Sequence, residues 1–379
     1  MKVLSIGTDR KIFEEGSAVL ERSIGYALRV EKLHIIVFSL KRHNFSQKNV
    51  GNLYIYPTNS LSRWFYIRDA IKIGKEIILK NGLKQGDFVI STQDPFETGL
   101  VGQKLKKKFN LPLQIQIHTD FLSPYFKNSF LNRIRVLISK FIIPKADGLR
   151  VVSSVIADSI KKEFPDIKAK IDILPIFVDI EKIIDRGNKF YKHDKTGLKI
   201  LMASRFTKEK RIDIGLEVLK KVRDDYKKDV GLTIIGFGPE KKNLEAKKDL
   251  LNLGDEVSIK EWEEDIFSAY READIFLLTS EYEGYGMTLI EAGASGCPIV
   301  TTEVGIAKTD LFKNSENSFV CPVGDVNCLS NRVIDLMKDS EKRKLFKDKM
   351  QDSIRREAIS KDAYTEKYVA LLSGLLAKT

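Results

Sequence analysis

The sequence predicts an α/β protein made of two doubly wound domains, and its periodicity, length and composition all favour this class. Short apolar runs alternate with helix-like segments, a pattern typical of parallel sheets covered by helices. The 379 residues exceed what one ordinary core organises, so two domains of roughly 180 residues each are expected. With 43% hydrophobic residues, the chain can bury both cores.

The N-terminal half opens with an apolar run over residues 1–7, which predicts the first parallel strand. Gly16 lies just before a helical pattern, where a loop joins strand to helix. Another strand is predicted over residues 112–117 and runs into His118. An isolated histidine is more often structural, but ligands of open α/β sheets bind at the carboxyl ends of strands, so His118 is a candidate site residue.

Positive charge is concentrated in this half. Residues 1–180 hold 29 Lys and Arg against 17 Asp and Glu, so they carry the whole net charge of +12. Within them, residues 130–143 form a basic amphipathic pattern that suits either an anionic membrane surface or a core helix with solvated cations. The charge asymmetry favours the membrane interpretation. Because no apolar run reaches the ~18 residues needed to span a bilayer, any such contact should be peripheral.

Other partners and compartments follow from composition. A basic surface could also bind nucleic acid, but the sequence has neither an RNP-type strand nor a zinc-finger spacing, so no nucleic-acid partner is expected. Three cysteines are too few for a disulfide framework, which favours a reducing cytoplasm. Four scattered histidines and no cysteine pairs at ligand spacing argue against a structural zinc site.

A domain boundary is predicted between residues 179 and 197, where charged and polar residues interrupt the periodicity. The predicted N-terminal domain therefore covers residues 1–180 and the C-terminal domain residues 181–361. A last helix is expected within residues 362–379.

Strands of the C-terminal half end in turns that suit a polar ligand. A strand over residues 200–203 precedes a basic turn with Arg205 and Lys210. The strand over residues 232–235 ends at Gly236 and Gly238, a weak signal taken alone. Trp262 follows a strand over residues 257–261 and could stack on a base or simply fill space.

The most informative segment follows an apolar strand over residues 275–278. A glycine-bearing turn leads into a short helix that Gly296 stops. The amides of Gly286, Met287 and Thr288 would lie at the helix N-terminus, where unpaired N–H groups and the positive dipole end favour a phosphate.

Two carboxylates flank this phosphate position. Glu283 lies in the loop, and Glu291 lies one helical turn beyond Met287. Such a pair is weak evidence by itself, since a helical glutamate is usually solvated. Phosphates between two hydroxyl-rich rings would match this layout, as in a nucleoside diphosphate carrying a sugar.

The run from Glu283 to Ala292, Glu-Gly-Tyr-Gly-Met-Thr-Leu-Ile-Glu-Ala, resembles the signature of the retaining nucleotide-sugar glycosyltransferases of family 4. This resemblance implies the GT-B architecture, with two Rossmann-like domains facing a cleft. It also implies transfer of a hexose-type sugar from a nucleotide-sugar donor to an acceptor hydroxyl, in envelope glycan or glycolipid synthesis. A lipid-linked or anionic glycan acceptor would suit the basic N-terminal half, and the last helix is expected to pack back on that domain, as in relatives.

The resemblance also implies roles for individual residues. Arg205 and Lys210 would hold the diphosphate, Glu283 would orient the sugar, Glu291 would hold the ribose and His118 would polarise the sugar from the other domain. No cofactor is expected, and a metal should be dispensable because protein cations take its role. The remaining expected substrate-binding residues are Gly16, Gly236, Gly238, Trp262, Gly284, Tyr285, Gly286, Met287 and Thr288.

Two other functions stay open at this point. A nucleotide-sugar epimerase of the same fold group would convert the donor without an acceptor. A non-catalytic nucleotide-sugar-binding module would bind the donor without turnover.

Overall fold

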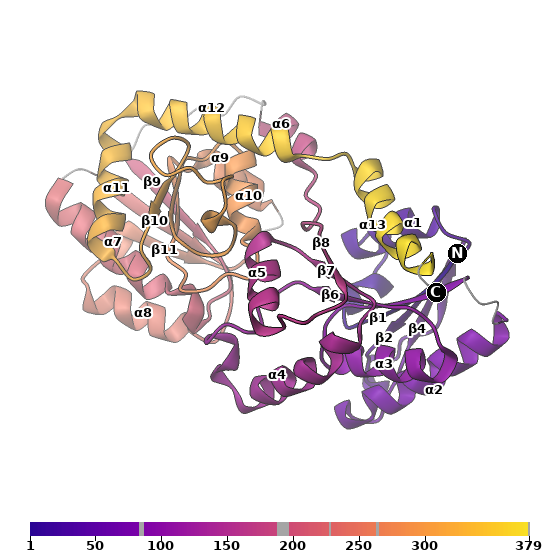
Figure 1. Ribbon diagram of the computed structural model, residues 1–379. Helices are drawn as coiled ribbons and strands as arrows, with labels where there is room; N and C mark the ends of the chain where they lie inside the picture. Colours follow the sequence, from indigo (N-terminus) through magenta and orange to yellow (C-terminus); the bar gives the residue numbers. More distant parts are fainter. Residues whose placement is uncertain (83–86, 188–196, 227–228, 263–264, 378–379) are drawn as a thin grey trace. The chain divides into compact units, whose positions relative to one another are not determined.

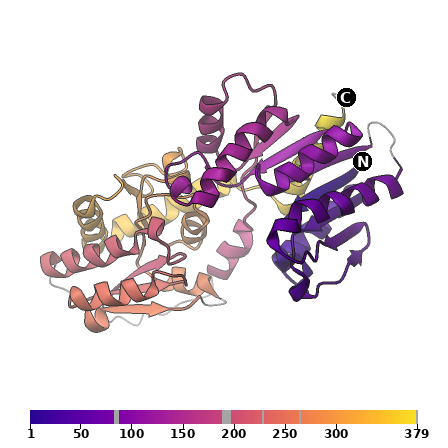
Figure 2. The ribbon, with the colours of Figure 1, turned by 90° about the horizontal axis from the view of Figure 1, so that it is seen from below.

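The computed structural model describes residues 1–82, 87–187, 197–226, 229–262 and 265–377 (Figure 1). The chain divides into two compact units. Unit 1 comprises Met1–Phe177 and Ile359–Thr379, and unit 2 comprises Val178–Ala358. Residues 188–196 of the predicted boundary lie outside the described residues. Each unit contains one sheet with helices on both sides, as Figure 2 also shows, so the predicted α/β class is confirmed.

Unit 1 is built on an eight-stranded sheet in the order β3-β4-β2-β1-β5-β6-β7-β8, parallel except where β3 pairs with β4. Its strands are β1 (Lys2–Gly7), β2 (Lys32–Val37), β3 (Lys48–Val50), β4 (Leu53–Pro57), β5 (Phe88–Thr92), β6 (Leu113–Ile117), β7 (Gly148–Val151) and β8 (Lys170–Ile173). Its α-helices are α1 (Ala18–Ala27), α2 (Tyr66–Lys80), α3 (Glu97–Phe109), α4 (Phe130–Ile142), α5 (Ser154–Glu163) and α13 (Lys361–Leu376).

Side-chain alternation along the strands assigns these helices to the two faces of the sheet. Val3, Leu33 and Val89 share a core with α1 and α13, which lie side by side (Figure 1). Ile36 and Ile90 point to the opposite face, where they lie close to glycines of α2 and α3. The sheet is therefore covered on both sides, as expected for parallel strands.

Unit 2 has a fully parallel six-stranded sheet in the order β11-β10-β9-β12-β13-β14. This order reverses between β9 and β12, as in doubly wound nucleotide-binding folds. Its strands are β9 (Leu198–Ala203), β10 (Val230–Ile235), β11 (Val257–Lys260), β12 (Ile275–Leu278), β13 (Ile299–Thr302) and β14 (Phe319–Cys321). Its α-helices are α6 (Ile180–Gly187), α7 (Ile212–Tyr226), α8 (Lys241–Leu250), α9 (Ile266–Glu272), α10 (Met287–Ala294), α11 (Val326–Lys338) and α12 (Ser340–Glu357).

Capping side chains determine where several helices begin. Ser17, Ser129 and Ser360 each accept a hydrogen bond from the backbone amide three residues ahead, at the starts of α1, α4 and α13. Asp325 and Asp339 do the same for α11 and α12. Helix α10 ends at Ala294, just before Gly296, as the sequence predicts. The φ of Gly296 is 82°, in the left-handed region that favours glycine after a helix.

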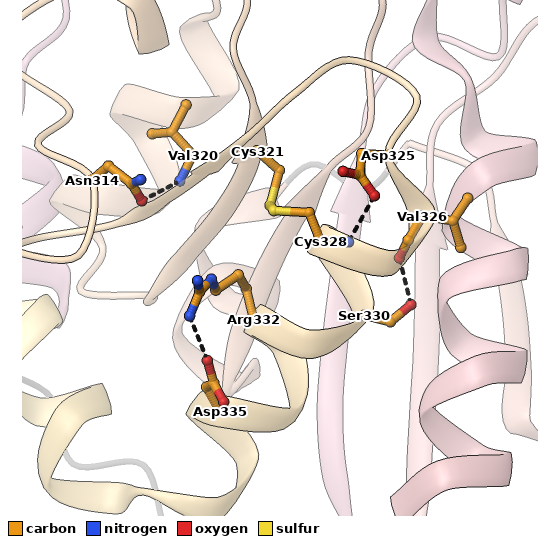
Figure 3. The surroundings of a disulfide bond; sticks show 9 residues. All are labelled: Asn314, Val320, Cys321, Asp325, Val326, Cys328, Ser330, Arg332 and Asp335. Carbon is orange, nitrogen blue, oxygen red and sulfur yellow. Dashed lines mark hydrogen bonds and ion pairs between the residues drawn. A yellow bond between two sulfur atoms is a disulfide. The ribbon is translucent and has the colours of Figure 1, made fainter.

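One disulfide joins Cys321 at the end of β14 to Cys328 in the first turn of α11 (Figure 3). The carboxylate of Asp325 accepts a hydrogen bond of 2.8 Å from the Cys328 amide, so the same turn is held twice. The third cysteine, Cys297, is buried and free. Cysteine number alone overlooked this bridge, and its presence removes the support that the cysteine count gave to a reducing compartment.

Candidate functional site

Lys210 and Glu283 meet where the strand order of unit 2 reverses. Lys210 ends the short 3-10 helix η6 (Lys208–Lys210) after β9, and Glu283 lies in the loop after β12. Lys210 Nζ lies 2.7 Å from Glu283 Oε2, and the two side chains are 12% and 9% exposed. Ser280 Oγ donates a second hydrogen bond of 2.7 Å to Glu283 Oε1. Both oxygens of the carboxylate are therefore held at the position where such sheets bind ligands.

The loops that carry this pair are joined through their backbones. The Glu281 amide donates to the Glu209 carbonyl at 2.9 Å. Thr279 Oγ1 lies 3.2 Å from the Lys210 carbonyl and 2.7 Å from the Arg211 carbonyl. Because these contacts fix the ends of β9 and β12 relative to each other, Lys210 and Glu283 are positioned by a rigid frame.

Arg211 extends this frame, although sequence reasoning did not select it. Its guanidinium is hydrogen-bonded to Asp213 and to Glu281, and these contacts, with Asp213 first, raise the pKa of Arg211. A φ of 46° puts its backbone in the left-handed region, where non-glycine residues are uncommon. Neither this conformation nor the contacts between the two loops can be read from the sequence. Sequence patterns therefore do not mark Arg211, Thr279, Ser280 or Glu281 as site residues.

Arg205, the second cation of the predicted diphosphate clamp, is placed differently from Lys210. Its side chain is 69% exposed, and its Nη2 lies 4.0 Å from Glu209 Oε1. Thr207 Oγ1 donates to the same Glu209 oxygen at 2.7 Å. Arg205 can therefore reorient toward a ligand at little cost, whereas Lys210 must exchange its contact with Glu283.

The N-terminus of α10 is open at its first turn. Gly286 occupies the cap position with a φ of 101°, and no side chain of the described residues caps the helix there. The preceding turn is fixed because the Ile306 amide donates to the Tyr285 carbonyl at 2.8 Å. A β-carbon at Gly305 would lie 2.5 Å from that carbonyl oxygen, so only glycine fits there. Met287 and Thr288 begin the helix, as predicted, and Gly284 lies in the turn before it.

Glu291 has a specific partner instead of being merely solvated. The hydroxyl of Tyr270, a fully buried residue, donates to Glu291 Oε2 at 3.2 Å. Burial raises the pKa of Glu291 above its ordinary value, although the Tyr270 hydrogen bond opposes this shift. The carboxylate is thus held in place one helical turn beyond the open end of α10.

Gly236 and Gly238 have a packing role that the structure makes plain. A β-carbon at Gly236 would lie 1.9 Å from the Ser204 carbonyl oxygen, and one at Gly238 would lie 2.4 Å from the Phe206 carbonyl oxygen. The turn after β10 therefore packs directly on the turn that carries Arg205. Trp262 follows β11 and is exposed.

In unit 1, His118 follows β6 and lines a cavity of about 540 Å³. Burial, followed by the charges of Arg150 and Arg22, lowers the pKa of His118 to about 3. The imidazole is therefore neutral near pH 7 and can serve as a hydrogen-bonding group but not as a cation. Gly16 is exposed in the loop before α1, with a φ of 71°. Among the described residues, no three His, Cys, Asp or Glu side chains are grouped so that they could hold a metal ion.

Two family models match the chain. "Glycosyl transferases group 1" matches residues 184–352, and "Glycosyltransferase Family 4" matches residues 22–182. Among curated proteins, N-acetyl-alpha-D-glucosaminyl L-malate synthase of Bacillus anthracis is 25% identical over 226 residues, which is 57% of this chain and 56% of that enzyme. The match thus spans little more than half the length of that relative.

Solved structures show the same fold. Sucrose-phosphate synthase of Thermosynechococcus elongatus superposes with a TM-score of 0.78 over 100% of both chains, at 18% identity. TarM of S. aureus, solved with UDP, gives a TM-score of 0.65 at 21% identity, covering 81% of this chain and 59% of that one. With family models matching both halves and two doubly wound Rossmann-like units, the chain belongs to glycosyltransferase family 4 and has the GT-B fold.

Proposed function

We propose that the protein is a retaining glycosyltransferase that moves a hexose-type sugar from a nucleotide-sugar donor to an acceptor hydroxyl. The carrying observation is the Lys210–Glu283 pair at the reversal of the strand order, next to the open N-terminus of α10. Cations and free amides at a helix start suit a diphosphate, and a fixed carboxylate suits sugar hydroxyls. The UDP bound in the structure of TarM, which has the same fold, supports a nucleotide donor.

In the proposed reaction, the bond between the anomeric carbon and the diphosphate breaks as the acceptor oxygen attacks from the same face. Lys210, Arg205 and the first amides of α10 stabilise the charge that develops on the leaving diphosphate. The leaving phosphate oxygen takes the acceptor proton, so no separate base is required. Glu283 binds the sugar hydroxyls and stabilises positive charge at the anomeric carbon.

Other residues bind the ends of the donor. Glu291, held by Tyr270, hydrogen-bonds the ribose, and Trp262 stacks on the base. Neutral His118 hydrogen-bonds the transferred sugar. No divalent ion is needed in this scheme, because the protein's own cations stabilise the diphosphate.

Helix α4 supports the further proposal that the enzyme binds an anionic membrane surface and takes a lipid-linked acceptor from it. Phe130 is 80% exposed and Leu137 is 67% exposed, and three more apolar side chains of the helix are also exposed: Leu131, Ile134 and Phe141. Arg133 lies among them, and no carboxylate of the described residues pairs with it. Exposed apolar and basic groups on one helix are the features of an interfacial helix. None of the helices in the described residues is both long enough and apolar enough to cross a bilayer.

The donor experiment separates this function from its alternatives. Purified protein is screened by thermal shift against UDP-, GDP- and ADP-sugars, and one donor is expected to raise Tm, because a ligand that binds the folded state stabilises it. That donor is then incubated with and without a membrane lipid extract, and the anomeric configuration of the product is read by NMR. Retention with extract supports the proposal. Conversion of the donor without extract would instead show an epimerase, and binding without turnover a binding module.

A further inference from the structure

The cavity of unit 1 has features that the donor site does not explain. Gly7, the last residue of β1, and Asp94, just after β5, line it where the strand order of the eight-stranded sheet reverses. Helices α1 and α13 contribute Arg22 and Tyr368 to its wall. Its volume of about 540 Å³ lies within the ~300–1,000 Å³ of typical small-molecule pockets.

Arg150 is a buried cation on this wall, and no acidic side chain of the described residues pairs with it. It is 4% exposed. Its Nη1 donates to Gln116 Oε1 at 2.7 Å, and its Nη2 donates to the Tyr364 hydroxyl at 2.5 Å and to the Leu174 and Pro175 carbonyls at 3.3 Å. Its Nε is buried and has no hydrogen-bond partner in the part of the chain that the structure describes. All of these partners are neutral, and the Tyr364 and Tyr368 rings lie 5.9 and 5.4 Å from the guanidinium carbon. The described residues therefore give this buried positive charge no carboxylate partner, and a ligand oxyanion would supply the counter-charge.

The acidic residues of the cavity do not supply it. Asp94 Oδ1 accepts from the amides of Phe96 and Thr98 at 2.7 and 3.3 Å, within its own loop. Asp9 is exposed, and its carboxylate accepts from the Lys11 amide. Among the described residues no carboxylate forms an ion pair with Arg22, which adds a second cation to the same wall.

A network of side chains holds the arginine in position. Gln116, which accepts from Arg150, donates through Nε2 to the Tyr368 hydroxyl at 3.0 Å and to Ser91 Oγ at 3.0 Å. The Tyr364 hydroxyl in turn donates to the Pro175 carbonyl at 2.9 Å. Strand β6, helix α13 and the segment after β8 therefore fix the guanidinium before any ligand arrives. Little reorganisation of the protein is then required when a ligand binds.

We propose that this cavity binds an oxyanion, a carboxylate or phosphate group of the acceptor, with Arg150 and Arg22 as its counter-charges. Naming the ligand as the acceptor rests on the proposed glycosyltransferase function, whereas the anion site itself does not. Ile12, Val19 and Ile176 also line the cavity, so the oxyanion is carried on a partly apolar body and is not a bare ion. Arg150 Nε, which has no partner among the described residues, offers an N–H donor to either group, and the charged guanidinium strengthens such a hydrogen bond.

Calorimetric titration tests this with malonate and with methyl phosphate as probes, at constant ionic strength set by chloride. Wild type is expected to bind one of them, and Arg22→Gln to bind it at least ~10-fold more weakly, since a charge-assisted hydrogen bond is lost. The exposed Arg42 lies in the same unit outside the cavity, so Arg42→Gln is the matched control and should stay within about twofold of wild type. Tighter malonate binding identifies a carboxylate acceptor, and tighter methyl phosphate binding a phosphate ester.

Removal of Arg150 could unfold unit 1, so the test of that residue uses Arg150→Lys, which keeps the charge but loses the planar fork. It should weaken binding of the anion by at least ~10-fold while far-UV circular dichroism stays unchanged. Equal affinities in wild type, Arg22→Gln and Arg150→Lys, or no binding of either probe to wild type, would overturn the inference. Titration of wild type with UDP is the separate measurement for the donor: failure there rejects the proposed function but leaves an observed anion site standing.

Discussion

The contact between Lys210 and Glu283 stabilises the free protein, but it must be broken when a donor phosphate binds to Lys210. Each side chain is the principal charged partner of the other, and both are largely buried. A ligand phosphate would replace Glu283 as the partner of Lys210 and so release the carboxylate toward the sugar. Removing one partner in the free protein leaves the other buried without compensation.

We therefore expect Lys210→Ala and Arg205→Ala to share one effect and differ in another. Both should lower kcat by about 100-fold, the scale for loss of a group that stabilises transition-state charge. Only Lys210→Ala should also lower the free energy of unfolding, by about 3 kcal/mol, since Arg205 is mostly exposed. Turnover assays and urea denaturation measure the two effects. Near-normal kcat in both folded variants would reject the clamp, and equal stability losses would reject the distinction.

The two glutamates should separate by kinetics. Glu283→Gln is expected to reduce mainly kcat, whereas Glu291→Gln should mainly weaken UDP binding, because one residue is assigned to the reacting sugar and the other to the ribose. Tyr270→Phe serves as the control, since it removes only the hydroxyl that holds Glu291 and should weaken UDP binding less. If calorimetry shows normal UDP affinity for Glu291→Gln but not for Glu283→Gln, the two roles are reversed.

Asp94 should make stability depend on pH. Burial raises the pKa of Asp94 from 3.8 to about 6, so the folded state binds this proton more tightly than the unfolded state. The resulting stabilisation is complete below pH 3.8 and is lost as the pH rises through 6. Asp94→Asn cannot titrate, yet it keeps the oxygen that accepts from Phe96 and Thr98. Its unfolding free energy relative to wild type should therefore rise by about 2 kcal/mol from pH 4 to pH 8. A difference that stays flat between pH 4 and pH 8 for Asp94→Asn would contradict the assignment.

At the scale of elements, the sequence predicted local structure well because its causes are local. Apolar runs predicted β9, β10 and β12, and Gly296 predicted the end of α10. The contacts of the site depend instead on which strands become neighbours. Lys210 and Glu283 are 73 residues apart, and they meet because β12 pairs with β9. Sequence periodicity does not encode that pairing. The sequence therefore predicts both residues as site residues, but it predicts neither their ion pair nor the hydrogen bond from Ser280 to Glu283.

Helix α4 allows the membrane proposal to be tested residue by residue. Arg135 is ion-paired with Glu97, and Lys140 is ion-paired with Glu163. No carboxylate of the described residues pairs with Arg133, so its positive charge is less compensated and more available to an anionic surface. In co-sedimentation with anionic vesicles, Arg133→Gln should therefore weaken binding more than Arg135→Gln, and Leu137→Ser should weaken it through lost apolar contact. Binding should also fall as salt rises, since exposed charges are screened beyond ~10 Å at 0.1 M. Equal sedimentation with neutral and anionic vesicles, or no sedimentation with either, would leave the basic half without a membrane role.

At the scale of the whole molecule, the chain ends by returning to the unit in which it began. Helix α13 belongs to unit 1, where Tyr368 and Leu372 pack into the core shared with β1 and β2. Its Tyr364 and Tyr368 also contact Arg150 and Gln116 on the wall of the cavity. The last helix of the chain is therefore required for both the core and the proposed anion site of the N-terminal unit.

Two matched core substitutions should report on the two units separately. Leu372 in α13 is 1% exposed, and Leu336 in α11 is fully buried in a core of unit 2. Each Leu→Ala change should cost about 3 kcal/mol, because it removes buried methyl groups and leaves a cavity. Since each unit has its own core, Leu372→Ala should speed amide hydrogen exchange in residues 1–177, and Leu336→Ala should do so in residues 178–358. If α13 were only loosely attached, Leu372→Ala would increase exchange in α13 itself and leave the strands of unit 1 protected. Faster exchange across β1 and β5 as well would show instead that the C-terminal helix is part of the cooperative core of unit 1.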